Sequence, residues 1–127
     1  MMEHELSGEF DVAHGAGLAV LTPAWMRFVC GENPGLFLQF ATRVMGVVMD
    51  DEHPELVIEA GIRRFEEFLQ EIGLAIRLRD LPFAEQVDEE TLQRIARRVR
   101  AVREDGSIGW LKRLSPDDIF HIFKQAF

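Results

Sequence analysis

Two of the four histidines in this sequence, His4 and His14, combine a residue type and a setting that could support chemistry. They lie ten positions apart in a stretch rich in glutamate, and His14 directly precedes a long apolar segment. A neutral imidazole among carboxylates can bind a divalent transition metal, since nitrogen and oxygen donors suit iron and zinc alike. A separation of ten residues matches no metal motif of a single helix, so the residues alone leave open a pair of structural or surface histidines.

The other residues that could react or bind have simpler interpretations. Cys30 ends an apolar segment and is expected to pack as a small hydrophobic residue. The densest basic run could form a phosphate-binding stripe, but acidic residues precede it and its spacing spreads it over the solvent side of a helix. It consists of Arg94, Arg97, Arg98, Arg100 and Arg103.

The overall charge argues against nucleic acid as a partner. Fourteen basic residues against 22 acidic ones give a formal net charge of −8, which repels phosphate backbones and anionic membranes. The sequence shows neither a signal-peptide pattern nor an apolar stretch of about 18 residues. The single cysteine excludes an internal disulfide and fits a reducing compartment. We therefore expect a cytoplasmic protein without a nucleic-acid or membrane partner.

Apolar residues recur at helical spacing along most of the chain, whereas strand patterns are scarce. The clearest helix runs from Pro54, which suits a helix start, to Gly73, which suits its end. Its apolar stripe consists of Ile58, Ile62, Phe65, Leu69 and Ile72. We expect the charged residues of the same helix on its other faces; they are Arg63, Arg64, Glu66, Glu67 and Glu71.

Four further segments predict helices. The segment Gly15 to Val29 is apolar nearly all round, so we expect it in the centre of the domain, with a kink at Pro23. The others follow Asn33-Pro34, run from Asp88 to Val102, and start at Pro116 behind a Ser115 cap. With 127 residues, the sequence predicts one all-α domain, residues 1–127, built as a bundle of five or six helices.

The chain also resembles the C-terminal part of the iron-containing alcohol dehydrogenases, in particular their butanol dehydrogenase branch. The resemblance is carried by His4-Glu5-Leu6-Ser7-Gly8, by Asp11-Val12-Ala13-His14-Gly15-Ala16-Gly17-Leu18-Ala19-Val20, and by Pro23-Ala24-Trp25-Met26. It extends through Ile72-Gly73-Leu74 and the tail with Ile108-Gly109, Leu114-Ser115 and Asp118-Ile119, and so covers nearly the whole chain.

The resemblance implies a two-domain enzyme that interconverts alcohols and aldehydes. Its N-terminal domain binds NAD(P), and its C-terminal helical domain holds one Fe(II) or Zn(II) through an aspartate and three histidines. His14 matches the last of those histidines. His4 matches a histidine that lies beside the metal without ligating it and that relays a proton or positions the substrate. The metal would act as a Lewis acid while the nicotinamide exchanges hydride.

The rest of the family pattern falls outside these residues. Three of the four metal ligands and the glycine-rich cofactor loop are missing from the sequence. We therefore expect a partial helical domain from a truncated reading frame, without the nucleotide-binding domain, that is inactive alone and binds neither metal nor NAD(P) tightly.

Large apolar side chains are numerous for a small bundle, and they include Trp25, Trp110 and ten phenylalanines. If upstream helices are missing, some of these side chains lose their cover, which predicts a dimer or a higher oligomer. The alternative to an enzyme fragment is a stand-alone helical oligomerisation or interaction module with neither metal nor catalysis.

Overall fold

The computed structural model describes residues 1–99 and 107–127, and α-helices dominate both ranges. The six α-helices are α1 (Met2–Phe10), α2 (His14–Val29), α3 (Pro34–Gln39), α4 (Pro54–Glu71), α5 (Glu89–Arg98) and α6 (Pro116–Ala126). Shorter turns of helix lie at Cys30–Glu32, Leu78–Asp80 and Ala84–Gln86, and α3 continues as the π-helix η2 (Phe40–Val44). Within the described residues, β pairing is limited to one bridge between Ile108 and Leu114. The predicted all-α class is confirmed.

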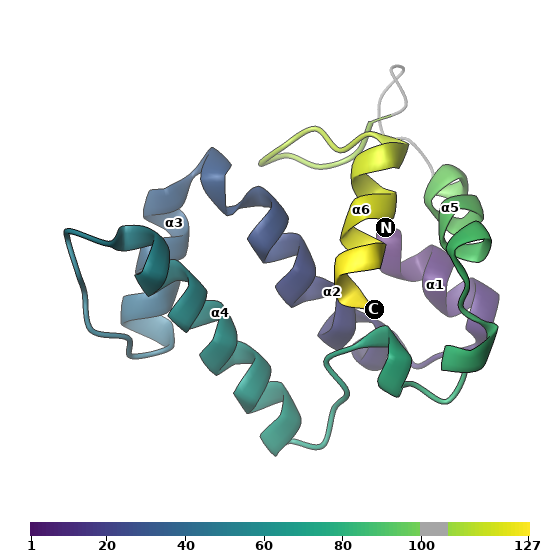
Figure 1. Cartoon of the computed structure of the whole chain (residues 1–127), viewed down its shortest axis with the longest axis horizontal. Helices are drawn as coiled ribbons and strands as arrows, with labels where there is room; N and C mark the ends of the chain where they lie inside the picture. The colour runs from purple at the N-terminus through teal and green to yellow at the C-terminus, as the bar shows by residue number, and fades with distance from the viewer. Residues whose placement is uncertain (100–106) are drawn as a thin grey trace.

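Helix α2 lies between two groups of helices (Figure 1). It contacts α1 and α6 on one side, where α5 completes the group, and it contacts α4 on the other, where α3 packs against α4. Its buried side chains include Val20, Leu21 and Val29. The central position predicted from its apolar composition is thus confirmed, and the helix continues through Pro23 without ending there.

Helix α4 begins and ends where the sequence predicted. Pro54 is its first residue, and Gly73 adopts a φ of 86° just after its end. The amide of Leu74 then donates to the carbonyl oxygen of Leu69 at 2.9 Å, which satisfies a free carbonyl of the last turn. Ile72 departs from the predicted stripe because it follows the last helical residue and is 56% exposed.

The capping residues of α5 and α6 also match the sequence. The Asp88 carboxylate accepts from the amide of Thr91 at 2.7 Å, and hydrogen bonds from Thr91 lower the pKa of Asp88. Ser115 and Asp118 form a reciprocal capping box at the start of α6. Helix α5 ends at Arg98, and the predicted continuation from 100 to 102 lies outside the described residues, as do Arg100 and Arg103.

Helix α1 was not predicted. Its stretch of sequence carries too few apolar residues to show a helical period, but Leu6 is fully buried, and Phe10 stacks on Phe83 with ring centroids 4.3 Å apart. Glu9 pairs with Arg94 and Arg98 of α5, so part of the basic run is a surface that binds α1. Tertiary contacts therefore stabilise this helix, in place of a strong local pattern.

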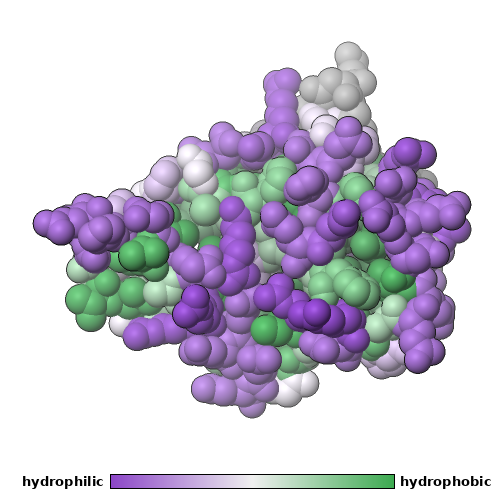
Figure 2. Space-filling view, in the orientation of Figure 1, coloured by the Kyte–Doolittle hydropathy of each residue, from purple (hydrophilic) through white to green (hydrophobic). Residues whose placement is uncertain are grey.

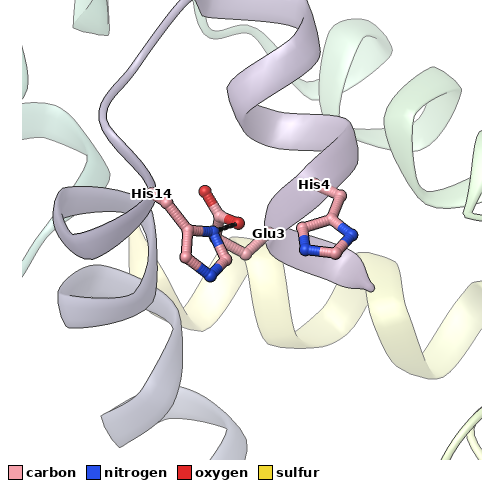
Figure 3. Close-up of side chains that lie close together, drawn as sticks. All are labelled: Glu3, His4 and His14. Atoms are coloured by element: carbon pink, nitrogen blue, oxygen red, sulfur yellow. Dashed lines mark hydrogen bonds and ion pairs between the residues drawn. The ribbon is translucent and has the colours of Figure 1, made fainter.

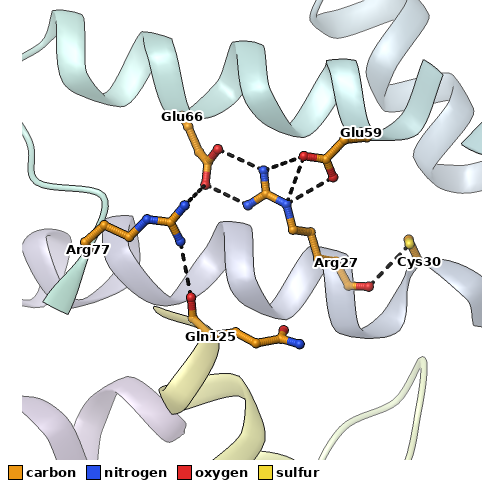
Figure 4. A network of polar contacts seen from close by, with 6 residues as sticks. All are labelled: Arg27, Cys30, Glu59, Glu66, Arg77 and Gln125. Carbon is orange, nitrogen blue, oxygen red and sulfur yellow. Dashed lines mark hydrogen bonds and ion pairs between the residues drawn. The ribbon is translucent and has the colours of Figure 1, made fainter. Parts of the chain in front are cut away.

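A partly buried ionic network joins α2 to α4 (Figure 4). Arg27 of α2 donates to both oxygens of Glu66 at 2.7 and 2.9 Å and to Glu59 at 2.8 to 3.2 Å. These hydrogen bonds, above all those to Glu66, raise the pKa of Arg27 above its usual range, although burial opposes the shift. Arg77 approaches Glu66 at 4.0 Å and donates to the carbonyl oxygen of Gln125 at 3.2 Å. The network links α2, α4 and the end of α6.

The sequence prediction placed Glu66 on a face of the helix other than its apolar stripe and gave no reason to expect its burial. Glu66 is only 6% exposed. Helical spacing identifies which residues share a face of one helix. It cannot show that a residue on another helix, here Arg27, neutralises a buried carboxylate.

One group of exposed hydrophobic residues lies at the α3 end of the molecule, at the left edge of Figure 2. Val48 is 85% exposed, Val44 69% and Leu36 52%. In the described part of the chain, no helix has both the length and the apolar character needed to cross a membrane.

The Arg27 network generates a stability prediction. Glu66→Gln removes the charge that faces Arg27 in the buried half of the network and should lower the free energy of unfolding by about 1–3 kcal/mol. Glu59→Gln is the matched control. Because the Glu59 side chain is 41% exposed, this substitution should lower the free energy of unfolding by less than about 1 kcal/mol. Urea unfolding followed by circular dichroism measures both. Equal effects of the two substitutions would contradict this account of the network.

Candidate metal centre

The short connection between α1 and α2 brings the two predicted site residues together. Asp11 ends α1 in the left-handed conformation with a φ of 50°, and α2 starts three residues later at His14. The ring centroids of His4 and His14 are 5.3 Å apart, with an angle of 42° between the ring planes. Both histidines are exposed, so both rings can be reached from outside this chain (Figure 3).

One ring nitrogen of His14 is hydrogen-bonded, and the other points away from that contact. Its Nδ1 is hydrogen-bonded to Oε2 of Glu3, and its side chain is 59% exposed. In Figure 3 the Glu3 carboxylate lies beside Nδ1, while the other ring nitrogen of His14 points away from it. The ring is therefore held from one side and open on the other.

Glu3 is the site residue that sequence reasoning missed. Its side chain is only 3% exposed, although a carboxylate is costly to bury without partners. The hydroxyl of Ser7, one turn later in α1, donates to Oε1. Only the pairing of a glutamate and a serine four residues apart hinted at this arrangement, and that spacing is common on exposed helices.

Gly17 makes the burial of Glu3 possible. A Cβ atom at this position would lie 2.6 Å from Oε1 and 2.8 Å from Cγ of Glu3, closer than real Cβ contacts allow. The carboxylate therefore lies against the bare backbone of α2, one turn after His14. Gly17 therefore leaves the room that the Glu3 side chain occupies between the two helices.

The donor set fits a divalent transition metal. Ligand atoms of Glu3, His4 and His14 all lie within 4.8 Å of one another, and among the described residues no other group of three or more such side chains does so. Two imidazoles and a carboxylate offer the nitrogen and oxygen donors that Fe(II) and Zn(II) accept. A tetrahedral or larger coordination sphere would require further donors, since Glu3 already accepts two hydrogen bonds.

A small apolar pocket lies next to these residues. It has a volume of about 170 Å³ and is lined by Leu18, Leu21, Thr22 and Trp25 of α2 together with Met1, Met2 and Glu3. Leu18 is one helical turn after His14 and is 42% exposed. Helical geometry thus places the pocket along the face of α2 that begins at His14.

Comparison with known proteins identifies related sequences over the whole length. Residues 1–127 match the family described as "Fe-containing alcohol dehydrogenase family, C-terminal". The NADH-dependent butanol dehydrogenase A of Clostridium acetobutylicum is 32% identical over 128 aligned positions, which cover 99% of this chain and 31% of that protein. The probable NADH-dependent butanol dehydrogenase 1 of Bacillus subtilis is 33% identical, covering 98% of this chain and 30% of that protein.

A solved structure has the same fold. The NADH-dependent butanol dehydrogenase A of Thermotoga maritima superposes with a TM-score of 0.83 at 34% identity, covering 98% of this chain and 31% of that one. The chain thus spans about 31% of the length of the relatives it matches.

The contact at Gly17 generates a second prediction. Gly17→Ala should push Glu3 away from α2 and lower the free energy of unfolding by about 1–3 kcal/mol, the usual cost of overpacking. Gly15→Ala is the matched control, because nothing lies within 4 Å of a Cβ there, and helix propensity should change stability by no more than about 1 kcal/mol. Thermal or urea unfolding compares the two variants. A neutral Gly17→Ala would show that the helices do not need this close approach.

Proposed function

Because this chain belongs to the iron-containing alcohol dehydrogenase family, we propose that it supplies the metal-facing helices of an NAD(P)-linked enzyme that interconverts alcohols and aldehydes. The observation that carries the proposal is the meeting of His4 and His14, 5.3 Å apart, at the junction of two helices. The relatives named above are butanol dehydrogenases, which supports a butanol-type substrate.

In this proposal His14 is the ligand that the chain contributes. Its Nε2 points away from Glu3 (Figure 3), its Nδ1 is hydrogen-bonded to that residue, and its backbone belongs to the first turn of α2. When bound, Fe(II) or Zn(II) supplies a Lewis acid that polarises the substrate oxygen. The chain's own contribution is to hold one imidazole in a constant orientation.

His4 is proposed as the catalytic histidine beside the ligand. Its ring is exposed, lies close to that of His14 and belongs to a different helix, so it can approach a substrate oxygen from the α1 side. An imidazole in this place can accept or return the hydroxyl proton, or hold the substrate by a hydrogen bond. The apolar pocket along α2 is suited to the alkyl part of a small alcohol, because Leu18, Leu21 and Trp25 line it.

The remaining parts of the enzyme are proposed to lie outside these 127 residues. The relatives align over about 31% of their length, and the part that matches here is helical. We propose that residues 1–127 form a partial helical domain and that the NAD(P)-binding domain and the other metal ligands belong to additional polypeptide. The chain alone would then bind metal weakly and have no activity, and its location would be the cytoplasm.

A chimera tests this function. Residues 1–127 replace the matched segment of the Thermotoga maritima butanol dehydrogenase, and metal content and NADH-dependent aldehyde reduction are measured. His14→Ala should remove the metal and the activity together. His4→Ala should keep the metal and lower kcat by about 10²–10⁴-fold, as expected for loss of a general acid–base group.

The two histidines act as controls for each other in this experiment. A chimera that keeps its metal after His14→Ala would contradict the ligand assignment. If the unmodified chimera, which carries both histidines, folds but binds no metal, the result would favour the stand-alone interaction module instead.

We also propose that the chain self-associates. Val44, Val48 and Leu36 at the α3 end are each more than half exposed, and burying such a surface favours association. Sedimentation at micromolar concentration should therefore detect a dimer or a larger species, and Val48→Glu should shift it toward the monomer. A compact monomer of the unmodified chain at that concentration would contradict the prediction.

A further inference from the structure

We propose that Glu3 is a positioning residue that fixes His14 as its Nδ1–H tautomer and so keeps the lone pair of Nε2 free for the metal. This inference takes one assumption from the proposed function, namely that His14 is a metal ligand. It assigns to Glu3 a role distinct from binding the metal itself.

The burial of the Glu3 carboxylate supports this role. The Glu3 side chain is 3% exposed, and among the described residues its ion-pair partner is the imidazole of His14. An ionised carboxylate can only accept hydrogen bonds, so the nitrogen that meets Oε2 must carry a hydrogen atom. A neutral imidazole with its hydrogen on Nδ1 has none on Nε2. The contact thus selects the tautomer that metal binding through Nε2 requires.

The surroundings of Glu3 also fix the carboxylate itself. The Ser7 hydroxyl donates to Oε1, which leaves Oε2 directed at His14. The backbone at Gly17 lies so close that a Cβ atom would meet Oε1 at 2.6 Å. One carboxylate is therefore held by a hydroxyl from α1, a backbone surface from α2 and an imidazole from the start of α2. These three contacts hold the carboxylate in one orientation, as expected for a group that orients a metal ligand.

Burial and hydrogen bonding also distinguish Glu3 from a metal ligand. One of its oxygens lies within 4.8 Å of a ring nitrogen of each histidine, so direct coordination is the competing assignment. Both Glu3 oxygens are already engaged, however, and the side chain is buried, whereas both imidazoles are exposed. A metal that arrives from outside the chain meets the imidazoles first. Glu3 lies on the inner side of His14 and acts on the metal through that ring.

The tautomer can be measured on the whole chain without metal. Uniformly ¹⁵N-labelled protein is studied by NMR at a pH where His14 is neutral, and the shifts of the two ring nitrogens report which one carries the hydrogen. A free histidine in water favours the Nε2–H tautomer, so a simple surface imidazole would show that form. We expect Nδ1–H for His14, together with an Overhauser contact between this hydrogen and the Glu3 side chain.

Variants then test the role of Glu3. Glu3→Met keeps the length of the side chain but removes the acceptor, so His14 should revert toward Nε2–H. Glu5→Met on the same helix is the matched control and should leave the His14 tautomer unchanged. Zn(II) affinity of the same proteins should fall about 10- to 100-fold for Glu3→Met and stay constant for Glu5→Met, as expected for loss of a group that orients a ligand.

The outcomes separate this inference from the proposed function. Nε2–H in the unmodified chain would overturn the role of Glu3, and this result does not depend on whether the Glu3→Met variant folds. Nδ1–H that persists in folded Glu3→Met would overturn it as well. The proposed function could fail while this inference holds. In that case NMR would show the Nδ1–H tautomer, but His14→Ala would leave Zn(II) binding unchanged, so His14 would be oriented by Glu3 without being a metal ligand.

Discussion

The close contact between α1 and α2 at Gly17 is the constraint on which the candidate site depends. Helix α1 has little apolar surface, and it is attached through Leu6, through Phe10 and through the Glu3 carboxylate that lies against bare backbone. The same carboxylate is hydrogen-bonded to His14, the first residue of α2, whose ring lies 5.3 Å from that of His4. A larger side chain at Gly17 would displace the Glu3 carboxylate and so disturb its contact with His14.

Most of the fold could be predicted because its helices have strong local signals. Helix α4 has an apolar stripe between a proline and a glycine, α6 has a complete capping box, and α2 is apolar enough to require burial on several sides. Helix α1 and the burial of Glu66 could not be predicted, because both depend on partners distant in sequence. Arg27 lies 39 positions from Glu66, and no periodicity records such a pair.

The site could be predicted only in part. A histidine ten positions from another gave weak information by itself, and the resemblance of the surrounding sequence to a known family singled out His4 and His14. The structure brings these two together and adds Glu3, whose type is too common to attract attention in a stretch rich in acids. What distinguishes Glu3 from Glu5 and Glu9 is burial against Gly17, which is a property of two helices and not of one segment.

The central claim is that His14 presents a metal-binding nitrogen that Glu3 orients. The most direct measurement is a crystal structure of the metal-loaded chimera with anomalous diffraction to locate the ion. We expect an ion about 2.1 Å from Nε2 of His14, with Nδ1 hydrogen-bonded to Glu3 and His4 nearby but not coordinated. An ion bound by the Glu3 carboxylate, or one that lies away from His14, would contradict it.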